Sequence, residues 1–196
     1  LNGIAIQRMI ELGQVDLAWR LFTNTNEIAL TRGVVGGLPE NLDAYPHPGE
    51  SAPRLTGTYL QGWSNAEQLR VWYQGFLGLQ PDIAQGVIRL APRLPNAVGD
   101  VEFKSRIGAG VLHAWYESSD RGRRYTWRLQ GQSARLDLDI VPFERHSFTV
   151  AAGDTLAVEH TAVGLVARHV GVDGGERQRV TLAPSPVRRE QQARLD

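Results

Sequence analysis

Apolar residues recur at helical spacing in three segments of the first half of the sequence. Two of these segments run from about residue 4 to 12 and from 15 to about 29, and Gly13 separates them. The third begins near Ser64, with Glu67 three residues later as in a helix-capping box, and it ends at Gly78. The spacing predicts three helices. Because apolar residues fall on several sides of the first two, we expect both to pack on more than one face.

A loop is predicted between the second and third helical segments, over residues 33–60. The stretch is rich in Gly and Pro, and it is several times longer than the usual connection of ~4–6 residues. Loops of this length are usually either functional or disordered. The loop is therefore where we first expect a site.

After Pro81 the pattern changes to short runs in which apolar and polar residues alternate, as in LDLDI at 136–140. Gly, Asp and Ser separate these runs at intervals of ~8–12 residues, which is typical of an antiparallel β-sandwich. GVDGGE at 171–176 has the composition of a hairpin turn. The predicted fold class is α+β. We expect helices in residues 1–80, a β-sandwich in 81–187 and a polar tail in 188–196.

Composition narrows the possible partners. The chain has 21 basic and 21 acidic residues and no net charge, which argues against nucleic acid or an anionic membrane surface as the main partner. No apolar run approaches the ~20 residues of a membrane span. The chain has no Cys, so disulfides and thiolate metal sites are excluded, and a reducing, cytoplasmic location fits. The sequence opens directly in a helical pattern without a leader, so we expect it to belong to a larger polypeptide.

The candidate chemistry centres on Glu40, a carboxylate in the Pro-rich loop. Glu40 could instead be a solvated surface acid. Glu67 is a second candidate carboxylate, and its alternative role is in the helix-capping box. The histidines are scattered without the spacing of metal ligands, so neither a metal nor another cofactor is expected. The run Glu144 to Ser147 contains acid, base and hydroxyl, but adjacent residues of a strand face opposite ways, which excludes a triad. Aromatic residues at 115–127 suit either a sandwich core or sugar stacking.

Several motifs, taken in order, resemble the carboxyl-terminal end of the amylo-α-1,6-glucosidase (glycogen debranching) family. These are GLPEN at 37–41, Q-x-W-S-x-A at 61–66, LGLQPD at 77–82 and LAPRLP at 90–95. Gly62 stands where the family usually has Ala. The similarity covers roughly residues 1–120 and is most specific between 33 and 70. It implies that the helices are the last ones of an (α/α)6 toroid.

The resemblance also implies roles for individual residues. Glu40 corresponds to the catalytic base of an inverting glycoside hydrolase, and Gln61 and Trp63 to the segment that lines the sugar site. Tyr45 and Tyr59 are further candidates for stacking on a glucose ring. In the family the general acid lies in an earlier loop, so it would precede this chain. Because three helices cannot close a toroid, we expect the chain alone to be inactive, with an oligo- or polysaccharide and an upstream catalytic segment of the same polypeptide as its partners.

Three alternatives to an α-1,6-glucosidase stay open. The motifs at 77–95 also occur in disaccharide phosphorylases with a helical toroid and, similarly, in α-L-rhamnosidases. Phosphorylases use inorganic phosphate as the nucleophile and need no base at Glu40, so GLPEN favours hydrolysis. The third alternative is a non-catalytic module that binds carbohydrate or supports a catalytic neighbour.

Overall fold

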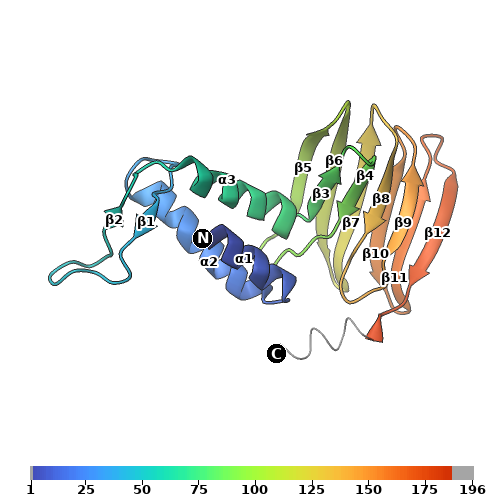
Figure 1. The fold of residues 1–196 in the computed structure, drawn as a ribbon. Coiled ribbons are helices and arrows are strands. Elements are labelled where there is room, and N and C mark those ends of the chain that lie inside the picture. Colours follow the sequence, from blue (N-terminus) through green and yellow to red (C-terminus); the bar gives the residue numbers. More distant parts are fainter. Residues whose placement is uncertain (1, 187–196) are drawn as a thin grey trace. The chain divides into compact units, whose positions relative to one another are not determined.

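The computed structural model describes residues 2–186, and the chain divides into two compact units between Phe76 and Leu77. The first unit is helical apart from one short hairpin, and the second is built from β-strands (Figure 1). The mixed α+β class predicted from the sequence is confirmed. None of the helices in the described part of the chain combines the length and the apolar character needed to cross a membrane.

The helical unit contains α1 (Asn2–Glu11), α2 (Val15–Thr31) and α3 (Gly62–Arg70), and α3 continues into a π-helical segment, η1 (Val71–Phe76). Its core is an aromatic cluster with ring centroids 5.2–6.3 Å apart, which joins α2 to η1. The members of the cluster are Trp19, Phe22, Trp72 and Phe76. Large rings of this kind dominate the apolar surface that such a small unit can bury.

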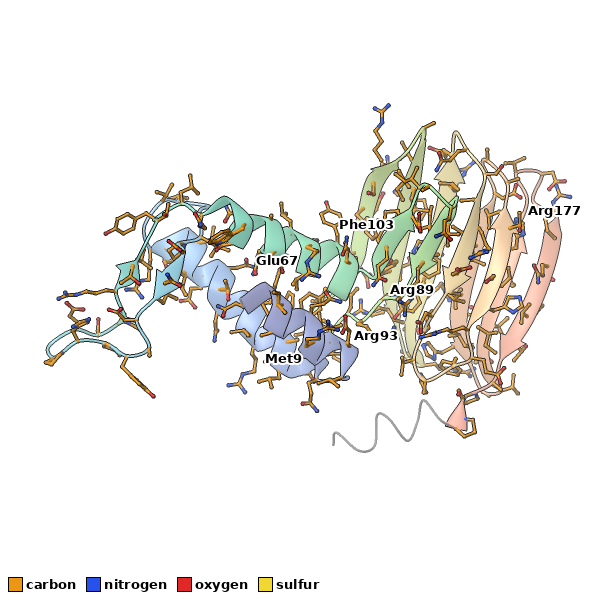
Figure 2. The ribbon with its side chains drawn as sticks, in the orientation of Figure 1. Met9, Glu67, Arg89, Arg93, Phe103 and Arg177 are labelled. Carbon is orange, nitrogen blue, oxygen red and sulfur yellow. The ribbon has the colours of Figure 1, made fainter. Side chains whose placement is uncertain are left out.

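The start of α3 differs from the predicted capping box. The N-cap is Gln61, without a side-chain cap hydrogen bond, and the hydroxyl of Ser64 instead donates to the carbonyl of Pro39. Glu67 packs against Gly3 of α1 and accepts hydrogen bonds from Arg70 (Figure 2). These hydrogen bonds from Arg70 lower the pKa of Glu67. Both side chains of the expected box therefore serve tertiary contacts, which spacing alone does not reveal.

The predicted loop contains a small hairpin, in which β1 (Asn41–Leu42) pairs antiparallel with β2 (Leu55–Thr56). The pairing continues on one side of the strands through the hydrogen bond from Asp43 N–H to the carbonyl of Arg54. Near the tip, His47 contacts Asp43 and Arg54 binds Glu50. The long loop is therefore an ordered structure.

The β-unit contains a six-stranded antiparallel sheet and a four-stranded sheet (Figure 1). The large sheet has the order β12-β11-β10-β7-β6-β5, and the small sheet has the order β3-β4-β8-β9. One pair, β4 with β8, is parallel, which the prediction of a purely antiparallel arrangement did not include. The strands are β3 (Leu79–Asp82), β4 (Val87–Leu90), β5 (Val101–Ile107), β6 (Gly110–Ser119), β7 (Gly122–Gln130), β8 (Ala134–Leu138), β9 (His146–Val150), β10 (Thr155–Thr161), β11 (Gly164–Val170) and β12 (Glu176–Leu182).

Side chains alternate between buried and accessible positions along the strands, as the sequence pattern predicted. Tyr116, Tyr125 and Trp127 are all less than 8% exposed, so they belong to the core and do not form a sugar-stacking surface. The Tyr116 hydroxyl accepts a hydrogen bond from Trp127 Nε1 (3.1 Å) and donates one to the carbonyl of Leu77 (2.8 Å), just before β3. This chain of hydrogen bonds joins the large sheet to the entry of the small one.

In the rest of the β-unit, one prediction from the sequence is confirmed and another is wrong. GVDGGE forms the predicted turn, which joins β11 to β12. The alternation in LDLDI breaks at Asp139, which is buried where the pattern placed an accessible side chain. Three arginines surround its carboxylate and stabilise the buried charge. The predicted polar tail at 188–196 lies outside the described residues.

Candidate functional site

The segment that carries Glu40 is attached to the first turn of α3 by three hydrogen bonds. The Leu38 N–H donates to Asn65 Oδ1 (3.0 Å), and the Leu38 carbonyl accepts from the Gln61 N–H (2.8 Å). The Ser64 hydroxyl donates to the Pro39 carbonyl (3.2 Å). Leu38 is itself 5% exposed. These contacts bring the GLPEN and Q-x-W-S motifs together, although some 20 residues separate them in sequence.

Glu40 lies at the base of the hairpin, where both its backbone and its carboxylate contact the returning strand. Its N–H donates to the Thr58 carbonyl (2.8 Å), and its Oε2 accepts from the Thr58 N–H (3.2 Å). Gly57, the residue before Thr58, has φ +73° and lies next to the carboxylate of Glu40. A Cβ at this position would approach Glu40 Oε2 to 2.6 Å. Gly57 is therefore required both for its left-handed backbone and for the room it leaves to Glu40.

This arrangement orients one exposed carboxylate. Oε2 is held by a backbone N–H, whereas Oε1 has no hydrogen-bond partner within residues 2–186. The two other acids of the loop, Asp43 and Glu50, are paired with His47 and Arg54. Among the acids of the loop, Glu40 therefore keeps an oxygen available to accept a proton from a bound molecule.

Of the four residues predicted to bind sugar, three belong to the segments that hold Glu40 and one lies further out in the hairpin. Tyr59 directly follows Thr58, and Gln61 and Trp63 lie at the start of α3, which holds the Glu40 segment. Tyr45 lies further out, beyond the last backbone hydrogen bond of the hairpin. Tyr45, Tyr59 and Trp63 are 81%, 60% and 63% exposed, so each ring has a face available to a ligand.

Sequence reasoning missed three residues that build this site: Gly57, Thr58 and Asn65. Thr58 contributes only backbone atoms, and Asn65 accepts from a backbone N–H 27 positions away, so neither leaves a local pattern. Gly57 carries a signal of its own, because a Gly between polar loop residues often marks a positive φ. The sequence pattern could not reveal that Glu40 occupies the space next to Gly57.

The described part of the chain contains no group of three or more His, Asp or Glu side chains that could hold a metal ion. A comparison with known proteins found no matching family model, no matching curated protein and no matching solved structure.

Proposed function

We propose that this chain is the carboxyl-terminal part of an inverting glycoside hydrolase that cleaves α-1,6-glucosidic branches or related α-glucosidic linkages. The observation that carries the proposal is the held carboxylate of Glu40, with one oxygen fixed by Thr58 N–H and the other open. The resemblance of GLPEN and Q-x-W-S to the debranching family supplies the substrate class. The hydrogen bonds between these two motifs support reading them as parts of one site.

In this mechanism Glu40 is the general base. Inversion needs an ionised carboxylate that activates water on one side of the sugar ring and a protonated acid ~6.5–9.5 Å away on the other. Thr58 N–H and the space above Gly57 orient Oε2, so that Oε1 is presented to the water. The general acid is assigned to the upstream segment of the same polypeptide.

The exposed aromatic side chains suit a carbohydrate substrate. A Trp or Tyr ring stacks on the apolar face of a pyranose, and its polar edge can still hydrogen-bond to a hydroxyl. Trp63 and Tyr59 are assigned to the glucose unit nearest Glu40, together with Gln61, and Tyr45 to a unit further along the chain. No cofactor or metal enters this reaction, and a cytoplasmic location is proposed with it.

The helical unit is proposed to form the last helices of an (α/α)6 toroid, and the two sheets a β-sandwich that follows it. The support is an unusually apolar surface on the helical unit, since proteins rarely expose so many large apolar side chains without a partner. We assign the upstream helices of the same polypeptide to this surface, apart from the rings of Tyr45, Tyr59 and Trp63, which are assigned to the sugar. Twelve large hydrophobic residues of the helical unit are exposed, against three in the described part of the β-unit: Ile4, Leu12, Leu17, Leu30, Val34, Val35, Tyr45, Tyr59, Leu60, Trp63, Leu69 and Tyr73.

The proposal is tested with the protein that contains this chain together with its upstream segment. Glucose release from an α-1,6-branched limit dextrin is followed by NMR, which also reports the anomer formed first. The mechanism predicts β-glucose as the first product, independent of added phosphate, because water attacks from the side opposite the leaving group. Retained α-glucose would contradict an inverting base.

Other outcomes favour the alternatives. Release of a sugar phosphate that depends on inorganic phosphate would identify a phosphorylase. Cleavage of α-L-rhamnosides in place of the dextrin would identify a rhamnosidase-type hydrolase. Sugar binding without turnover, unchanged when Glu40 is replaced, would identify a non-catalytic module.

A further inference from the structure

The β-unit has a pocket of about 410 Å³ that the proposed hydrolysis does not use. It opens between the end of β4, the end of β8 and the start of β9. Figure 2 labels Arg89 in β4 and Arg93 just after this strand. The residues that line it are Arg89, Asp137, Leu138, Asp139, Arg145, His146 and Ser147. The lining is polar and charged, and it therefore calls for a polar ligand.

The floor of the pocket is the carboxylate of Asp139, whose side chain is 2% exposed. Arg89 donates to its Oδ2, and Arg145 Nε lies 3.0 Å from the same oxygen. Arg93 lies 3.5 Å from Oδ1 and donates to the Asp139 carbonyl at 2.9 Å. A buried carboxylate needs a compensating charge, but one guanidinium already provides it. Three guanidinium groups therefore share this one carboxylate.

The second acid of the pocket is also satisfied. Asp137 is bound by Arg135, at 3.0 and 3.2 Å, and by the Ser147 hydroxyl at 2.7 Å. Arg89 and Arg145, which both line the pocket, thus share the one carboxylate of Asp139, while Asp137 is already paired with Arg135. Guanidinium groups gathered so closely repel one another unless an anion joins them.

Two of the arginines can reach such an anion. Arg89 and Arg145 are 45% and 68% exposed, and both line the pocket. Arg145 contacts Asp139 through Nε, and its two terminal nitrogens have no partner in the described part of the chain. A guanidinium presents five N–H donors in a rigid fork, so its outer edge stays available for a second oxyanion.

We propose that this pocket binds a phosphate group, held by Arg145 and Arg89 above the buried Asp139. Two guanidinium groups that face one pocket match a phosphate dianion better than a singly charged carboxylate, and their forked donors match its oxygens. The volume exceeds that of a phosphate ion, so the pocket has room for the group to which a phosphate monoester is attached. The site lies within the β-unit and its action does not depend on Glu40.

Isothermal titration calorimetry of the intact protein tests the proposal, with inorganic phosphate, methyl phosphate and acetate as probes in low-chloride buffer. We expect phosphate or methyl phosphate to bind with a dissociation constant of about 1 mM or tighter, and acetate to bind roughly tenfold more weakly. Tighter binding of the monoester would assign the pocket to a phosphorylated molecule, and tighter binding of inorganic phosphate to the free ion. Added chloride should weaken both, because it screens and competes.

Arg145→Gln removes one of the two positive charges that face the pocket but leaves Asp139 with Arg89 and Arg93. We expect it to weaken phosphate binding about tenfold or more, while Arg145→Lys, which keeps the charge and loses the fork, falls between it and the wild type. Arg106→Gln is the matched control, because Arg106 is an exposed arginine of β5 outside the pocket. Equal phosphate binding by wild type and Arg145→Gln, equal affinity for acetate and phosphate, or no binding by folded wild type would overturn the proposal.

Discussion

At the scale of single residues, the candidate site depends on what surrounds Glu40 more than on Glu40 itself. An exposed glutamate in a loop is ordinarily a mobile, solvated side chain. Here the backbone of Thr58 bonds to both the main chain and the carboxylate of Glu40, and Gly57 leaves the space that the carboxylate occupies. Orientation of this kind turns an ordinary acid into a candidate base, because proton transfer requires a fixed geometry.

Gly57→Ala should therefore impair catalysis without unfolding the hairpin. The new Cβ would meet Glu40 Oε2 at 2.6 Å and displace the carboxylate. A displacement of about 1 Å costs on the order of 10²-fold in rate. Gly49→Ala is the matched control: it has a similar positive φ of +83° but no atom within 4 Å of the added Cβ. Turnover of both variants is measured in the protein that contains the upstream segment. It should fall for Gly57→Ala alone, and an equal loss in the two would assign the effect to backbone strain.

A second glycine shows the same principle in the β-unit. Gly78 has φ +67°, and a Cβ there would lie 2.0 Å from the carbonyl carbon of Ala91, whose N–H donates to the Gly78 carbonyl. The sequence predicted Gly78 as a helix stop. Its structural role is larger, because it lets two backbone segments touch.

Gly78→Ala should lower the free energy of unfolding well beyond the cost of positive φ alone. Gly86→Ala, with φ +63° and no atom within 4 Å, isolates that cost, which is about 1–2 kcal/mol. The steric contact at Gly78 should add about 2 kcal/mol or more. Urea unfolding compares the two variants, and failure of Gly78→Ala to fold agrees with this expectation. Equal stabilities would show that the contact relaxes freely.

At the scale of elements, the sequence predicted the kinds of structure correctly and their connections poorly. Helical and alternating periodicities identified the helices and most strands, because each reflects one buried face. The parallel pairing of β4 with β8 left no signal, since strand order depends on contacts between distant segments. The capping box failed partly for the same reason, because the Ser64 hydroxyl bonds to the distant Pro39 carbonyl. Glu67 bonds locally, to Arg70 of the same helix.

In the β-unit, the buried hydroxyl of Tyr116 links β6 to β7 and to Leu77, just before β3, by hydrogen bonds that a substitution can remove. Tyr116→Phe would leave the Leu77 carbonyl and Trp127 Nε1–H without their partner. Because each buried group left unsatisfied costs about 1–3 kcal/mol, we expect a loss of about 2 kcal/mol or more in the free energy of unfolding.

Tyr125→Phe is the matched control. Tyr125 is also buried, and its ring contacts that of Tyr116 edge-on, but its hydroxyl has no hydrogen bond within the described residues. It should change the free energy of unfolding by less than about 1 kcal/mol. Urea denaturation of both variants gives the comparison, and equal losses would show that the hydrogen bonds of Tyr116 contribute nothing specific.

At the scale of the whole molecule, the two units differ in how completely their apolar residues are covered. Alternating strands bury one face of each sheet, as the pattern predicted, whereas the helical unit leaves side chains such as Leu30 and Val35 at 66% and 82% exposure. The sequence showed apolar residues on several sides of the helices and so predicted more than one packed face. The assignment of upstream helices as the cover of these side chains comes from the proposed toroid. No residue of this chain identifies the covering segment.

The candidate site around Glu40 was also predicted only in part from the sequence. Motif resemblance singled out Glu40, and the structure adds the contacts that orient it. The arginine pocket was hidden, because the alternation in LDLDI places Asp139 outward. Its burial depends on arginines from two other segments, Arg89 and Arg93 at the end of β4 and Arg145 before β9. Clusters assembled from distant positions of this kind carry no local pattern.

The measurement that tests the central claim most directly is the turnover of Glu40→Gln in the protein that contains the upstream segment. The substitution keeps the shape of the side chain and removes its ability to take a proton. We expect glucose release from limit dextrin to fall by roughly 10²–10⁴-fold, with unchanged unfolding by urea. Glu50→Gln, which changes a paired carboxylate of the same loop, should retain nearly full activity. Turnover of Glu40→Gln equal to that of the wild type would show that Glu40 is a surface acid and that the base lies elsewhere.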